Sequence, residues 1–326
     1  MFDFANKKVL VAGGTGLIGI PLVEILIQEG AQVRIASLDH ESRAHKQAEF
    51  RKIDLLKMDN CLHVCEGMDY VFNLLCAKGP PRFNKEKPAT LFEMNLMLDV
   101  NMLSAAREKG ADGYLLASSL AVYPPAEVFH EDDVWKGFPS KNDWFAGLAK
   151  RMGEIQAEAY RLQYGWEKIS IVRPANTYGP YDDFESDAAM VIPYLIREAV
   201  GGRNPLRMES DGLQVRDFIH ARDVARGMML VAKKGVSEPV NLGSGIGYTI
   251  RQVLEIVLRH SECTPKTIWK DSGPSGDRRR VLDVQRARSL GFEPQISLEE
   301  GIRETVEWYR THKDFARQTR FNLFSS

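Results

Sequence analysis

Short apolar runs alternate with segments of helical periodicity along the first half of the chain. An apolar run bounded by turn residues is typical of a buried strand, whereas apolar residues three or four positions apart are typical of a helix. The predicted strands are Lys8–Ala12, Gln32–Ala36, Tyr70–Leu75, Gly113–Ser118 and Ile169–Val172, and the predicted helices are Leu17–Gln28, Leu91–Lys109 and Trp144–Tyr164. This alternation indicates an α/β protein with a doubly wound parallel sheet that helices cover on both faces.

The composition of the 326-residue chain excludes several classes of function. A formal net charge of -1 provides no global basic field, so we expect no nucleic-acid partner and no membrane partner. No apolar stretch approaches the ~20 residues of a membrane helix, and the N-terminus does not resemble a secretion signal. The four cysteines and seven histidines lack the spacing of a disulfide framework or a metal site. We therefore expect a cytoplasmic protein without a bound metal.

A glycine-rich turn follows the first predicted strand and opens the first predicted helix. Gly13, Gly16 and Gly19 allow the backbone to turn tightly, to approach a pyrophosphate and to pack the helix on the strand. The unpaired N–H groups of the helix N-terminus attract phosphate oxygens. This strand–turn–helix context predicts a Rossmann domain that binds NAD or NADP.

Further motifs follow in a fixed order along nearly the whole chain. They are the serine segment 118–123, Lys150, the segments 173–180 and 216–225, Asn241-Leu242-Gly243 and Gly291–Pro294. With the glycine-rich turn, they resemble the extended short-chain dehydrogenase/reductase superfamily of NAD-dependent epimerases, dehydratases and reductases. The resemblance implies an enzyme of carbohydrate biosynthesis, with a smaller C-terminal substrate domain beside the Rossmann domain.

The same resemblance implies the domain boundaries. Residues 1–176 plus about 215–250 would form the NAD(P)-binding Rossmann domain. About 177–214 plus 251–326 would form the sugar-nucleotide-binding domain. We also expect a homodimer through the helices near 95–107 and 144–164, as in the family.

The run from Gly179 to Pro193 is nearest to GDP-fucose synthase-like enzymes, so a GDP-linked nucleotide sugar is the expected partner. The cysteine and histidine with which such enzymes epimerise C3 and C5 fall at Ala121 and Met190. Neither side chain can move a proton, so 3,5-epimerisation by that mechanism is not expected. We expect an oxidoreductase acting at C4 of the sugar, with a 4-epimerase as the alternative.

The catalytic positions implied by the resemblance are Ser119, Lys150 and a tyrosine four residues before the lysine. A lysine cation one helical turn away lowers the pKa of a phenol, which is ordinarily near ~10. In this chain the tyrosine position holds Ala146, which has no proton to exchange.

Three interpretations of Ala146 follow. The alanine replaces a working tyrosine, in which case Ala146→Tyr should raise turnover by ~10²-fold. Alternatively, the alanine belongs to a natural variant in which water or a substrate hydroxyl carries the proton. In the third interpretation the chain is a non-catalytic protein that binds nucleotide sugars.

The candidate cofactor contacts lie in the turn and after the next strands. Ser37 stands where an acidic residue would grip the ribose of NAD, and Arg43 could reach a 2′-phosphate, whereas Asp39 favours NAD. On balance these residues slightly favour NADP over NAD. The remaining candidates for the cofactor are Thr15, Leu17, Ile18, Asp54, Leu55, Ala77, Lys78, Lys150 and Pro174. The candidates for the sugar nucleotide are Asn176, Val191, Arg216 and Arg280, because guanidinium groups suit a diphosphate.

Overall fold

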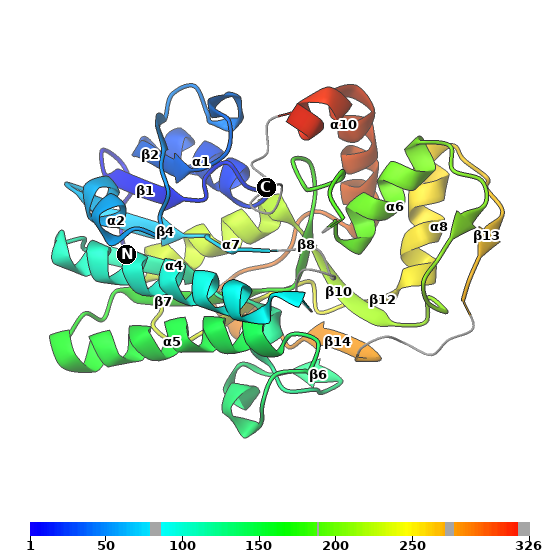
Figure 1. The fold of residues 1–326 in the computed structure, drawn as a ribbon. Coiled ribbons are helices and arrows are strands. Elements are labelled where there is room, and N and C mark those ends of the chain that lie inside the picture. Colours follow the sequence, from blue (N-terminus) through cyan, green and yellow to red (C-terminus); the bar gives the residue numbers. More distant parts are fainter. Residues whose placement is uncertain (79–85, 188, 271–276, 319–326) are drawn as a thin grey trace.

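The computed structural model describes residues 1–78, 86–187, 189–270 and 277–318. A seven-stranded sheet and a smaller layered region lie side by side (Figure 1). The first part of the chain forms β1 (Lys8–Ala12), α1 (Gly19–Gln28), β2 (Gln32–Ser37), η1 (Glu41–Arg43), β3 (Glu49–Lys52), α2 (Met58–Cys65), β4 (Tyr70–Asn73), α4 (Pro88–Glu108), β5 (Gly113–Ala117), η2 (Leu120–Val122), β6 (Val128–Phe129), η3 (Glu131–Lys136), α5 (Trp144–Tyr164) and β7 (Ile169–Pro174). The rest forms β8 (Asn176–Tyr178), α6 (Val191–Val200), β9 (Leu206–Arg207), β10 (Val215–His220), α7 (Ala221–Lys234), β11 (Val240–Leu242), β12 (Gly247–Thr249), α8 (Ile250–Ser261), β13 (Thr267–Ile268), β14 (Arg279–Leu282), α9 (Gln285–Ser289) and α10 (Leu298–Gln318).

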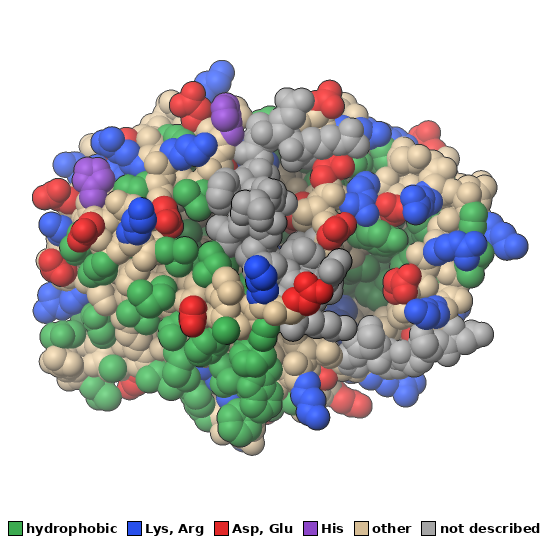
Figure 2. All heavy atoms as spheres, viewed as in Figure 1, with side chains coloured by type: hydrophobic (Ala, Val, Ile, Leu, Met, Phe, Trp, Pro, Cys, Tyr) green, Lys and Arg blue, Asp and Glu red, His purple; other side chains and the backbone are tan. Residues whose placement is uncertain are grey.

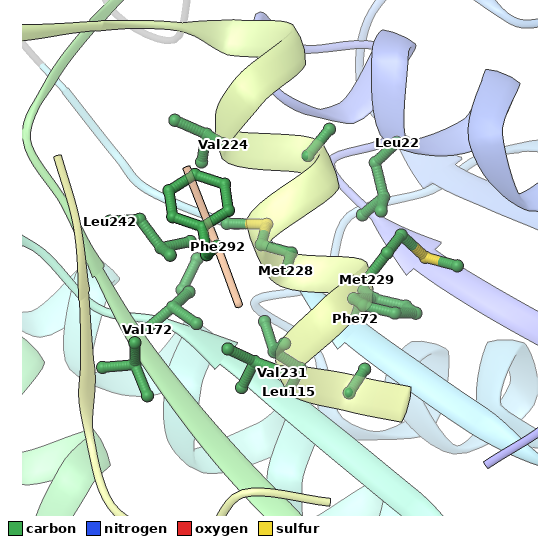
Figure 3. Close-up of a cluster of buried hydrophobic side chains, with 14 of the residues drawn as sticks. Leu22, Phe72, Leu115, Val172, Val224, Met228, Met229, Val231, Leu242 and Phe292 are labelled. Carbon is green, nitrogen blue, oxygen red and sulfur yellow. The ribbon is translucent and has the colours of Figure 1, made fainter. Parts of the chain in front are cut away.

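The seven-stranded sheet is parallel throughout, in the order β11-β7-β5-β4-β1-β2-β3. Neighbouring residues of a strand point to opposite sides of the sheet. Since the inner strands are almost continuous apolar runs, both faces of the sheet are apolar. Leu115 of β5 belongs to the apolar cluster that includes residues of α1 and α7, whereas Leu116 belongs to the cluster with α2, α4 and α5. Figure 3 shows the first of these faces, where Met228 of α7 lies among Val172, Leu242 and Phe292. The predicted doubly wound α/β fold is confirmed.

The smaller region is built on a second sheet. Its strands have the order β12-β10-β14-β6, and β8 pairs with β10. The helices α6, α8 and α10 bury a separate apolar cluster that includes Leu195, Val253 and Ile302. The pair β9 and β13 lies at its outer edge (Figure 1).

The predicted strands and helices agree with the structure to within a few residues. Trp144–Tyr164 has the predicted bounds, whereas the first helix begins at Gly19 because Leu17 and Ile18 belong to the turn. Of the returning segment near 215–250, β11 pairs with β7 in the large sheet and β10 lies in the second sheet.

Candidate functional site

The glycine-rich turn connects β1 to α1 at the carboxyl end of the large sheet. Gly13 has a φ of 83°, in the left-handed region that favours glycine. A Cβ on Gly19 would lie 2.3 Å from the Gly13 carbonyl oxygen, so only glycine lets the helix begin this close to the turn. The turn therefore has the close approach of helix to strand that a dinucleotide-binding site requires. Gly16, Leu17 and Ile18 complete it and are half-buried.

The end of β2 faces this turn through a hydroxyl and carboxylate cluster. The Thr15 hydroxyl lies 2.6 Å from the Ser37 hydroxyl and donates to Asp39 Oδ2 at 2.7 Å. The backbone N–H of Asp39 donates to the Ser37 hydroxyl oxygen at 3.1 Å. The carboxylate of Asp39 thus lies beside the turn, where the second strand of a Rossmann domain ends and the cofactor ribose binds.

Arg43 is 4% exposed and links three parts of the chain. Its Nε donates to the Thr15 carbonyl oxygen at 3.1 Å, and its Nη2 donates to the Tyr181 carbonyl oxygen at 3.0 Å. The guanidinium also lies over the Phe315 ring, 5.5 Å from its centroid. Two of its donors therefore face backbone carbonyl groups, which the sequence did not indicate.

The remaining cofactor candidates lie in the loops after β3 and β4. Asp54 Oδ1 accepts from the Leu56 N–H at 3.0 Å, while Leu55 is buried. The backbone N–H and carbonyl of Ala77 both bond to the buried Asn95 side chain at 2.9 Å, so Asn95 fixes this loop. Sequence reasoning missed Asn95, which is one of two buried asparagines on α4. Lys78 is exposed.

Ser119 follows β5 and begins η2. Its hydroxyl oxygen accepts from the Ala121 N–H at 3.1 Å. A Cβ on Gly147 would lie 2.2 Å from the Ala121 carbonyl oxygen, so α5 approaches η2 at a glycine. Ala146 is the residue before this contact and is half-buried. The tyrosine position of the family thus lies beside the serine segment and presents only a methyl group.

Lys150 lies one turn further along α5 and is 4% exposed. Its Nζ donates to the Leu75 carbonyl oxygen at 2.9 Å and to Asp99 Oδ1 at 3.1 Å. The neighbouring residue Leu74 lines the turn, because a Cβ on Gly13 would be 3.4 Å from the Leu74 carbonyl oxygen. The segment Leu74–Leu75 therefore joins the lysine to the glycine-rich turn.

A buried ion pair fixes α5 to the large sheet. Glu154 accepts from Arg173 Nε at 3.0 Å and Nη2 at 2.7 Å, and the Ser118 hydroxyl donates to it at 2.5 Å. Arg173 Nη1 also donates to the Tyr123 hydroxyl oxygen at 2.9 Å. Burial raises the pKa of Tyr123 above its ordinary value, so this phenol stays protonated. These side chains hold α5 against the large sheet.

Two arginines of the second sheet lie next to each other. Arg216 of β10 and Arg280 of β14 are partners in the parallel register. Arg280 Nη2 lies 2.5 Å from both Asp143 and Asp277. Burial and the neighbouring Arg280 lower the pKa of Arg216 from its ordinary value. Because Asp143 immediately precedes α5, this arginine pair adjoins the helix that carries Ala146 and Lys150.

The other candidate residues occupy the connection to the smaller region. Pro174 ends β7, and the Asn176 side chain donates to the Asp217 carbonyl oxygen at 2.8 Å. Val191 begins α6 and packs against the apolar cluster that α6, α8 and α10 bury. The structure thus brings Asn176 together with β10, the strand of Arg216.

The described residues contain no group of three or more His, Cys, Asp or Glu side chains placed to hold a metal ion. None of the helices in the described ranges is long and apolar enough to span a membrane.

The glycine turn, the serine and the lysine can hold a dinucleotide beside a hydroxyl donor, and the arginine pair can hold a diphosphate. A model of the NAD dependent epimerase/dehydratase family matches residues 9–243. Across 312 residues the chain is 30% identical to GDP-L-fucose synthase 1 of Arabidopsis thaliana, covering 93% of each protein. It is 31% identical to GDP-mannose 3,5-epimerase of the same plant, covering 98% of this chain and 87% of that protein.

Two solved structures of epimerases have the same fold as this chain. An epimerase from Methanothermobacter thermautotrophicus superimposes with a TM-score of 0.87 at 25% identity, covering 96% of this chain and 95% of that one. A UDP-glucose 4-epimerase from Thermotoga maritima, solved with UDP-glucose, gives a TM-score of 0.84 at 26% identity, covering 94% of this chain and 99% of that one.

Proposed function

Because this chain belongs to the NAD dependent epimerase/dehydratase family, we propose that it is an NAD(P)-dependent oxidoreductase acting at C4 of a GDP-linked nucleotide sugar. One observation carries the proposal: Ser119, Leu75 and the glycine-rich turn follow β5, β4 and β1, which are neighbours in the sheet, and Lys150 bonds to the Leu75 carbonyl oxygen. Ligands of doubly wound sheets bind at this edge. The GDP-linked relatives support the nucleotide, and the arginine pair supports the diphosphate.

Each residue has a distinct task in this reaction. A nicotinamide cofactor held at the glycine-rich turn would supply hydride transfer to or from the sugar carbon. The Ser119 hydroxyl polarises the oxygen on that carbon, and the Lys150 ammonium holds the cofactor ribose. Ala146 supplies no proton, so the proton comes from water or a substrate hydroxyl, unless a tyrosine has been lost from this position.

The test is an assay of the purified protein with NADH or NADPH and a GDP-4-keto-sugar, beside Ser119→Ala as the control. A reductase consumes the reduced nicotinamide, seen as a loss of its absorbance. The second candidate, a nucleotide-sugar 4-epimerase, interconverts 4-epimers without net change in the cofactor, and its support is the similarity to the Thermotoga enzyme. If the protein binds the nucleotide sugar but neither consumes the reduced cofactor nor interconverts 4-epimers, it is a non-catalytic binding protein.

For the cofactor we infer NAD, although the sequence leaned toward NADP. Two donors of Arg43 face the carbonyl groups of Thr15 and Tyr181, so a 2′-phosphate would have to displace bonds buried in the protein. The Asp39 carboxylate beside Thr15 is suited to accept a ribose hydroxyl and would repel a phosphate.

We also propose a homodimer through α4 and α5. Six apolar residues of α5 follow one another at intervals of three and four, as in helices that pack together: Phe145, Leu148, Met152, Ile155, Ala159 and Leu162. Leu162 is 79% exposed and Ile155 is 44% exposed in the single chain. Figure 2 shows hydrophobic side chains gathered over α5 and over the neighbouring segment that contains η3.

We assign cofactor binding to residues 1–176 with about 215–250, and sugar-nucleotide binding to the rest. Packing of α7 on the large sheet and pairing of β11 with β7 support the return of the chain to the first region. The strand β10 lies where the two meet, since it carries Arg216 in the second sheet and leads directly into α7.

A further inference from the structure

Asp99 is a buried carboxylate that the family pattern did not single out. It lies on α4, its side chain is 1% exposed, and its Oδ1 forms the ion pair with Lys150 of α5 at 3.1 Å. Asn73 Nδ2, from the end of β4, donates to the same oxygen at 3.1 Å. Burial raises the pKa of Asp99, and the lysine and the amide oppose that effect. The carboxylate therefore has two donors that stabilise its charged form.

The helix that carries Lys150 leaves room for this carboxylate. A Cβ on Gly153, less than one turn after Lys150, would lie 3.0 Å from Asp99 Oδ2. Any larger side chain at 153 would crowd the carboxylate or push α4 away from α5. The glycine and the ion pair thus occur together at one contact between the two helices.

The ion pair changes what Lys150 can do for a neighbour. A lysine lowers the pKa of a phenol one turn away because its positive charge stabilises the phenolate. Here the Asp99 carboxylate lies within hydrogen-bond distance of the same ammonium, and its negative charge opposes that effect at position 146. Two ammonium protons bond to Leu75 and Asp99, which leaves the third for the cofactor ribose.

We propose that Asp99 is a positioning residue that fixes the Lys150 ammonium for the cofactor ribose and neutralises its charge, so that this site works without a phenol at position 146. The proposal rests on the function proposed above, since it assigns Lys150 to the cofactor. It makes Ala146 part of a native arrangement. A tyrosine introduced at this position alone would not recover the ~10²-fold gain expected of a working general acid–base.

The decisive experiment measures the phenol directly and needs no substrate. Ala146→Tyr is prepared with ¹³Cζ-labelled tyrosine, and the added signal is titrated by NMR in the full-length protein. We expect the new phenol to titrate at or above its ordinary pKa of ~10. In Ala146→Tyr/Asp99→Asn, where the amide has the shape of the carboxylate without its charge, we expect a pKa lower by at least ~1 unit. Ala146→Tyr/Asp112→Asn, with the change at an exposed carboxylate, is the matched control and should resemble the single variant.

A phenol that titrates well below ~10 in Ala146→Tyr alone would overturn the proposal. So would equal pKa values in the single variant and the Asp99→Asn double variant. If the double variant fails to fold, the single variant still decides, because it keeps the ion pair intact. Failure of the proposed function appears separately, as a lack of cofactor or sugar turnover in the parent protein, and leaves the titration unaffected.

Discussion

Arg216 and Arg280 occupy paired positions on the neighbouring parallel strands β10 and β14. Arg280 forms ion pairs with two carboxylates, whereas Arg216 forms none within the described part of the chain. The Asp143 and Asp277 carboxylates offset the repulsion between the two guanidinium groups, and Arg216, without an ion pair of its own in that part of the chain, is suited to hold a ligand phosphate.

Removing the charge of Arg216 should therefore weaken nucleotide-sugar binding. A charge-assisted hydrogen bond is worth about 1.5–3 kcal/mol, so Arg216→Gln should raise the Kd for a GDP-sugar by roughly 10–100-fold. Isothermal titration calorimetry measures the Kd of the parent protein and of each variant. Arg279→Gln is the control, because strand alternation points that side chain to the opposite face. Equal losses in both variants would show that Arg216 has no specific part in binding.

The Thr15–Asp39 contact should determine the choice of cofactor. Asp39→Asn removes the negative charge that repels a 2′-phosphate while keeping an oxygen acceptor. We expect the ratio of NADH to NADPH affinity to fall by about tenfold or more, measured by quenching of protein fluorescence. Glu41→Gln, two residues further along in an exposed position, should leave the ratio nearly unchanged. A parent protein that already prefers NADPH would refute the assignment of NAD.

The exposed leucine of α5 should be needed for the dimer. Leu162→Glu places a charge on the apolar face of α5, so light scattering should show the mass of one chain instead of two. Leu213→Glu changes another exposed leucine, in the smaller region, and should keep the dimer mass. The dimer proposal fails if the parent protein has the mass of one chain at micromolar concentration.

His220 should make the fold less stable as the pH falls. Burial lowers the pKa of His220 from 6.5 to about 4, so the unfolded chain binds a proton more readily than the folded protein. The free energy of unfolding should therefore decrease as the pH falls from about 6.5 to about 4, by at most about 3 kcal/mol.

In His220→Asn an amide oxygen can still accept from the Arg222 N–H at the start of α7, but the side chain does not titrate. Urea unfolding of both proteins at several pH values in this window should show their stability difference shrinking toward acid. Parallel curves would contradict the assignment of this titration to His220.

Sequence alone determined the elements and the family because both depend on local patterns. Apolar periodicity placed α5 at residues 144–164, and the spacing of Gly13, Gly16 and Gly19 identified the turn. Periodicity reports which face of an element is buried, and a glycine turn is defined by its own backbone. These signals need no information about distant residues.

Only the tertiary structure decided which charged groups meet. Arg43 bonds to the carbonyl of Tyr181, 138 residues away, and Lys150 pairs with Asp99, 51 residues away. From the sequence, Arg43 could reach a 2′-phosphate and Lys150 occupied the lysine position of the family, but neither partner could be identified, because the sequence does not show which groups lie beside a charge. Packing of α4 against α5 brings Asp99 to Lys150, and the segment after β8 brings the Tyr181 carbonyl to Arg43. The chemistry of the site depends on these partners.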